Sequence, residues 1–167
     1  FDAEGRADTA FAENGLGAVH WPVALDGVSV GAAMVSNTGI WLALNANGVD
    51  GSRSAGLFSL DAAGAVRRSF GEAGWLSQST WRRPIGLVEL SSREQLFVVQ
   101  EEGPSPRVAL HSIWRDGSPS ERVRGSEDPE GFPEAFSATH LRGSRRFHRL
   151  LMLGSRGRGI EVIRLWI

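Results

Sequence analysis

The sequence predicts an all-β protein built from three tandem four-stranded antiparallel units, which we interpret as blades of a β-propeller. Three observations predict this fold. Short apolar runs rich in Val, Leu, Ile and Trp alternate with Gly, Asn, Ser and Pro along the chain. Apolar residues never keep a helical spacing for three turns. A turn phrase with Asp and Gly recurs every 54 to 59 residues.

The recurring phrase is clearest in residues 1–15 and 60–74. Its matching positions are Asp2, Gly5, Phe11 and Gly15 in the first copy, and Asp61, Gly64, Phe70 and Gly74 in the second. A third, degraded copy begins at residues 114–117. The phrases divide a single domain, residues 1–167, into units of about 1–59, 60–113 and 114–167.

Within each unit, three apolar runs precede the turn phrase, and a fourth short strand is expected to follow it and end at the Phe. Asp at such a turn can accept hydrogen bonds from nearby backbone, and Gly can take a positive φ. Four antiparallel strands in tandem are typical of propeller blades. A β-trefoil, with three copies of four strands, is the alternative. The expected strands are residues 28–35, 40–44, 54–60, 85–90, 96–100, 108–114, 136–141, 150–153 and 160–167.

The chain begins and ends out of phase with this unit. Residues 7–11 read as a fourth strand and residues 160–167 as a third strand. We therefore expect the two segments to lie side by side and complete the last unit, because closure removes exposed sheet edges. Propellers typically have four to eight blades. A protein partner or a second copy of this chain is expected to complete the ring.

The turn phrases resemble those of the delta-60 repeat family. Residues 1–15 retain two Asp, the Phe and two Gly of that pattern, and residues 60–74 retain the Leu, Asp, Phe and three Gly. The third copy departs from it, with Val123 where Phe is expected. The resemblance implies a bacterial β-propeller that is exported, extracellular or on the cell surface, without a common catalytic residue.

Composition narrows the functional classes. A formal net charge of −1 over 167 residues disfavours nucleic acid as a partner. No apolar run approaches the ~20 residues that span a bilayer, so no membrane span is expected. The absence of Cys excludes disulfides and thiolate metal sites.

Catalytic and metal motifs are weak throughout the chain. Residues 45–51 combine Asn, Asp and Gly, but they lack the acids of a calcium loop and are better interpreted as a turn. The four His lack the spacing of a zinc site, and no Gly-x-Ser-x-Gly phrase occurs. We therefore expect no catalytic residue, no metal and no cofactor.

These patterns favour a non-enzymatic structural or protein-interaction scaffold. The alternatives are a glycan-binding or glycan-cleaving propeller, in which Trp stacks on sugars and carboxylates act as acid and base, and a trefoil lectin. Trp41, Trp114 and Trp166 lie in expected strands and should pack between blades. Trp75 and Trp81 flank a turn and are expected to be exposed anchors. The candidate partner-binding residues are Trp75, Trp81, Arg82, Arg83, Arg142, Arg145, Arg146 and Arg149.

Overall fold

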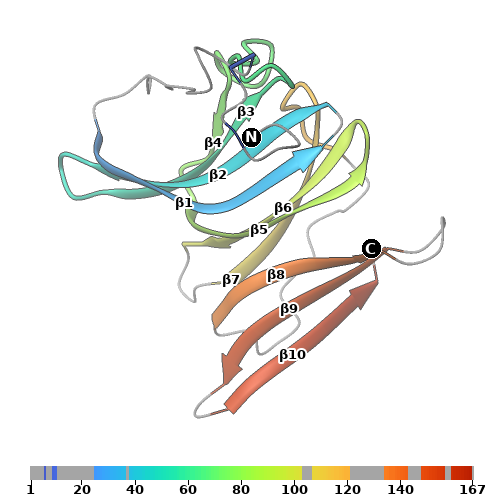
Figure 1. The fold of residues 1–167 in the computed structure, drawn as a ribbon. Coiled ribbons are helices and arrows are strands. Elements are labelled where there is room, and N and C mark those ends of the chain that lie inside the picture. Colours follow the sequence, from blue (N-terminus) through green and yellow to red (C-terminus); the bar gives the residue numbers. More distant parts are fainter. Residues whose placement is uncertain are drawn as a thin grey trace.

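The computed structural model describes Arg6 and residues 9–10, 25–36, 38–102, 107–120, 134–142, 148–156 and 159–166. These residues form ten β-strands and no helix (Figure 1). The predicted all-β class is confirmed. A search of the described residues found no helix long and apolar enough to cross a membrane.

Consecutive strands form three separate antiparallel meanders (Figure 1). The first sheet has the order β1 (Leu25–Ser36), β2 (Gly39–Gly48), β3 (Arg53–Leu60) and β4 (Trp75–Ser77). The second sheet contains β5 (Trp81–Ser91), β6 (Glu94–Glu101) and β7 (Arg107–Trp114). The third sheet contains β8 (Glu134–Arg142), β9 (His148–Arg156) and β10 (Gly159–Trp166). Each of the nine expected strands overlaps one of these ten strands.

The expected fourth strand is placed differently from the prediction. In the first sheet, β4 follows Phe70 instead of ending at it. The chain turns back after β3, where the Arg67 N–H donates to the Ser59 carbonyl at 3.0 Å, and positive φ angles at Gly71, Ala73 and Gly74 form a second turn before β4. The described parts of the second and third sheets contain three strands each, so four-stranded units are not found in all three sheets.

The expected closing strand at residues 7–11 is wrong at Thr9 and Ala10, which lie in a turn. The other residues of this segment lie outside the described part of the chain. The expected partner segment, residues 160–167, largely coincides with β10, which pairs with β9 in full antiparallel register.

The turns after β3 and β7 repeat the same backbone hydrogen bonds. Asp61 N–H donates to the Ala65 carbonyl, and Trp114 N–H donates to the Ser118 carbonyl, each at 2.8 Å. Three such bonds recur 53 residues apart: 61 to 65 with 114 to 118, 64 to 61 with 117 to 114, and 67 to 59 with 120 to 112. The two turns therefore repeat one pattern of backbone hydrogen bonds, although their side chains match less closely.

Side chains and glycine stabilise these turns as the sequence predicted. Asp61 Oδ1 accepts hydrogen bonds from the N–H groups of Ala63 and Ala65, both at 2.9 Å. In the second turn, the Ser118 hydroxyl and N–H both donate to Asp116 and lower the pKa of its carboxyl group. Gly64 and Gly117 take φ angles of 84° and 90°.

A compact aromatic core holds the first sheet against the second. Trp41 and Phe70 meet edge to face with their ring centroids 4.9 Å apart, and Trp81 and Phe97 do the same at 4.9 Å. All four rings are fully buried in one cluster. Trp41 therefore packs between sheets as expected, whereas the expectation for Trp114 is wrong because 41% of its surface is exposed. The side chain of Trp166 lies outside the described part.

The second sheet is covered on both faces. All six residues from Glu94 to Val99 are buried, although successive side chains of a strand point to opposite faces. β5 lies against β1, β2 and β3 of the first sheet and against β8 of the third sheet (Figure 1). Burial on both faces explains why β6 has a continuous apolar run from Leu96 to Val99 instead of an alternating pattern.

The turn after β7 docks directly on the segment that follows the turn after β3. Gly71 N–H donates to the Asp116 carbonyl at 2.9 Å. A Cβ atom on Gly117 would lie 2.6 Å from Gly71 N and 3.3 Å from the Phe70 ring, so only glycine fits there. This contact links the two repeated turns.

We predict that Gly117→Ala destabilises the fold more than Gly51→Ala, as measured by urea unfolding. Both positions have a positive φ, which costs a side chain about 1–2 kcal/mol. A Cβ at Gly51 meets nothing within 4 Å, whereas at Gly117 it clashes with the docked backbone. The clash adds about 1–3 kcal/mol. Equal losses in the two variants would contradict the docking contact.

Candidate cationic site between the first and second sheets

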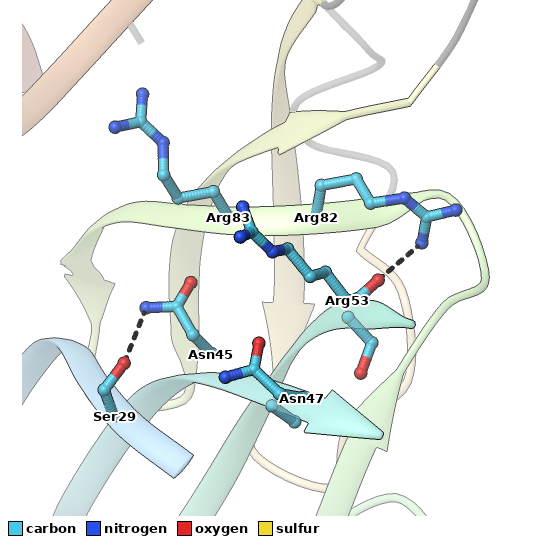
Figure 2. A pocket seen from close by; sticks show the side chains of 8 residues that line it. Ser29, Asn45, Asn47, Arg53, Arg82 and Arg83 are labelled. Atoms are coloured by element: carbon cyan, nitrogen blue, oxygen red, sulfur yellow. Dashed lines mark hydrogen bonds between the residues drawn. The ribbon is translucent and has the colours of Figure 1, made fainter. Parts of the chain in front are cut away.

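A polar pocket of about 260 Å³ lies where β5 passes the first sheet (Figure 2). Among the described lining residues, three side chains are guanidinium groups and none is a carboxylate. The first sheet contributes from three of its strands, and β5 contributes two adjacent arginines. The lining residues are Ser29, Asn45, Ala46, Asn47, Arg53, Ser54, Arg82 and Arg83.

Arg82 and Arg83 reach the same pocket because β5 is irregular at this point. Neighbouring residues of a regular strand point to opposite faces. The pairing of β5 with β6 skips Arg82, since Trp81 lies opposite Glu101 and Arg83 opposite Gln100. This register shift is a β-bulge, which redirects a side chain relative to its neighbours.

The Arg82 guanidinium ties the two sheets together. Its Nη1 donates to the Arg53 carbonyl at 3.0 Å and to the Ser79 carbonyl at 2.8 Å. Its Nη2 forms an ion pair with Glu102. Ser79 and Glu102, which lie next to β5 and β6, therefore fix the Arg82 guanidinium. The same group bridges to β3 through the Arg53 carbonyl (Figure 2).

The guanidinium groups of Arg53 and Arg83 lie in different surroundings. Arg83 Nε donates to the neutral side-chain carbonyl of Gln100 at 3.1 Å. Arg53 is exposed, and no described residue accepts a hydrogen bond from its guanidinium. In Figure 2 the Arg53 side chain extends across the pocket between β2 and β5. Among the described lining residues, positive charge therefore exceeds negative charge.

Neutral polar groups cover the opposite wall of the pocket. Asn45 and Asn47 are two residues apart in β2 and so lie on the same face of the sheet. Asn45 Nδ2 donates to the Ser29 hydroxyl at 3.3 Å (Figure 2). β1 and β5 approach closely beside this wall. A Cβ atom on Gly31 of β1 would lie only 2.5 Å from Pro84 of β5. The amides can both donate and accept hydrogen bonds.

Trp81 immediately precedes these arginines, and its buried side chain holds the start of β5 in place. Its Nε1 donates to His111 Nε2 at 3.1 Å, and the same His111 nitrogen lies 2.9 Å from Glu101 Oε1. Trp81 is 0% exposed, so the expectation that it is an exposed anchor is wrong. It fills the space between sheets because its ring packs on Phe97 and His111.

The described lining of this pocket includes none of the other predicted candidates. Trp75 is half-buried against the cluster formed by Leu44, Phe58 and Leu60. Its ring also covers Gly56, where a Cβ would lie 2.1 Å from the ring. Arg142 ends β8 opposite His148, and Arg149 lies in β9 opposite Leu141. Arg145 and Arg146 lie outside the described residues. The partner-binding role of these residues stays a prediction.

Sequence reasoning identified Arg82 and Arg83 but missed Arg53, Asn45 and Asn47. The segment 45–51 had been interpreted as a turn, whereas β2 extends to Gly48 and the turn begins after it. Two asparagines at alternate positions of a strand were the available signal, because such a pair faces one side.

A second, shallower pocket of about 300 Å³ lies at the end of β7, lined by Arg93, Trp114, Arg115 and Asp116. Its arginines stand beside the exposed Trp114 ring. Arg93 of this second pocket therefore serves as a control for the arginines of the pocket beside β5.

Acidic residues of the described core are engaged internally. Glu94 is buried and accepts hydrogen bonds from the hydroxyls of Ser112 and Ser120. Glu101 is buried beside His111. No group of three or more His, Asp or Glu within the described ranges is arranged to hold a metal ion.

Comparisons of the chain with protein families, with curated proteins and with solved structures found no match.

We predict that His111→Phe shifts the indole N–H resonance of Trp81 in an NMR spectrum. Indole Nε1 only donates, so His111 Nε2 must accept in the Trp81 bond. The substitution keeps a ring in place but removes this acceptor, so the indole N–H loses its hydrogen bond.

Trp41 provides the control, because no described residue accepts a hydrogen bond from its buried Nε1. Its resonance should stay nearly constant in the same variant. A Trp81 resonance that does not move in His111→Phe would contradict the hydrogen bond to His111.

Proposed function

We propose that this chain is a non-enzymatic propeller-type module that acts as a structural or protein-interaction scaffold. One observation carries the proposal: the second sheet is buried on both faces, with β5 against strands of the first sheet on one side and β8 of the third sheet on the other. Propeller blades are four-stranded sheets repeated around a central channel, and their neighbours cover each other's faces.

The arrangement of the strands supports a radial stack. β1, β5 and β8 are the first strands of their sheets, and β5 lies against both of the others. The sheets then extend away from these strands as meanders (Figure 1). A trefoil would instead need strands of all three units in one barrel, and the described strands form three separate sheets.

The engaged acids favour a scaffold over a glycan-cleaving enzyme. Glycoside hydrolysis generally uses two carboxyl groups that flank the scissile bond. No described residue in the lining of the pocket beside β5 is a carboxylate, and the buried Glu94 accepts hydrogen bonds from Ser112 and Ser120. The resemblance to delta-60 repeats supports the further proposal of an exported or surface-located bacterial protein.

A propeller needs more blades than the three sheets that the described residues form, and completion by a second copy is testable. We expect native mass spectrometry and light scattering of the purified chain to give a dimer, at twice the 18.0 kDa of one chain. Dissociation on dilution should expose apolar surface and increase binding of a hydrophobic dye. A chain that stays monomeric at all concentrations, with no dye response, would contradict this completion.

A further inference from the structure

We propose that the cationic pocket beside β5 binds a carboxylated sugar unit, a uronate. The Arg53 guanidinium holds the carboxylate, and the asparagine and serine side chains of the first sheet hold the ring hydroxyls. The pocket lies within one chain, so this inference does not depend on completion of a ring.

The charge of the lining selects an anion. Arg53, Arg82 and Arg83 bring three guanidinium groups to a space where none of the described lining residues is a carboxylate. Arg82 forms an ion pair with Glu102 outside the lining, so the selection of an anion rests on Arg53. The planar guanidinium fork matches the geometry of a carboxylate, with which it forms two parallel hydrogen bonds. Arg53 is the available fork, because no described residue accepts from it.

The neutral side chains select hydroxyl groups beside that anion. Asn45, Asn47 and Ser54 line the same pocket as Arg53. An amide presents both donors and an acceptor, so it can hydrogen-bond a hydroxyl in either direction. The hydrogen bond of the Asn45 side chain to Ser29, at 3.3 Å, uses one of its amide hydrogens. A carboxylate adjoining several hydroxyls is the chemistry of a uronate.

The size and lining favour a sugar unit over an acidic peptide. The pocket volume of about 260 Å³ is below the roughly 300–1,000 Å³ of sites for drug-sized ligands, which suits one small ring. Protein partners usually insert aromatic or aliphatic anchors into apolar pockets. Ala46 is the one apolar side chain in this lining. The pocket therefore offers a peptide little apolar surface.

The test is calorimetric titration of the full chain with methyl glucuronide and with methyl glucoside, its neutral counterpart. We expect measurable binding of the glucuronide and at least tenfold weaker binding of the glucoside, because charged hydrogen bonds exceed neutral ones in strength. A short oligoglutamate peptide is titrated in parallel. Equal binding of both sugars, or binding of oligoglutamate without the glucuronide, would overturn the proposal.

Variants locate the site. Arg53→Gln should weaken glucuronide binding about tenfold or more, and Asn45→Ala should weaken the glucuronide while acetate, which has no hydroxyls, is unaffected. Arg93→Gln removes an arginine from the second pocket and should leave binding unchanged. Unchanged binding in Arg53→Gln, or an equal loss in Arg93→Gln, would overturn the assignment. A monomer that binds glucuronide would contradict completion by a second copy and still support this site.

Discussion

The packing of Trp81 between the first two sheets is the constraint on which the rest of the structure depends. Its ring meets Phe97 of its own sheet, and it belongs to the same buried cluster as Trp41 of the first sheet and Phe70 of the segment between β3 and β4. Its one polar atom is satisfied by His111, so burying the indole leaves no unpaired donor. This anchor fixes the start of β5 and hence the position of Arg82 and Arg83.

The pocket follows from that anchor and from one irregularity. With Trp81 held inside, a regular strand would send Arg82 outward and Arg83 inward. The bulge at Arg82 relaxes this alternation and brings both arginines to the edge of the first sheet. The Arg82 bond to the Arg53 carbonyl then joins β5 to β3. The same bulge therefore shapes both β5 and the pocket beside it.

Much of the strand pattern could be predicted from the sequence, because each strand is a short apolar run between turn residues. The run from Leu96 to Val99 marked a strand buried on both faces, and Asp61 with Gly64 marked a turn. The fourth strand was misplaced because Phe70 is a core residue of a turn and not the end of a strand. Trp81 was expected to be exposed and is buried, whereas Trp114 was expected to be buried and is exposed. Periodicity does not tell which end of a strand a neighbouring sheet covers. Arg53 could not be assigned to the pocket without knowing that β3 adjoins β5.

The central claim, that the second sheet is enclosed between its neighbours, is tested most directly by amide hydrogen exchange. Exchange is slowest where opening requires global unfolding. The amides of β6 from Leu96 to Val99 should exchange most slowly, and those of β1, an edge strand of the first sheet, markedly faster. Exchange of β6 as fast as that of β1 would contradict the enclosed sheet.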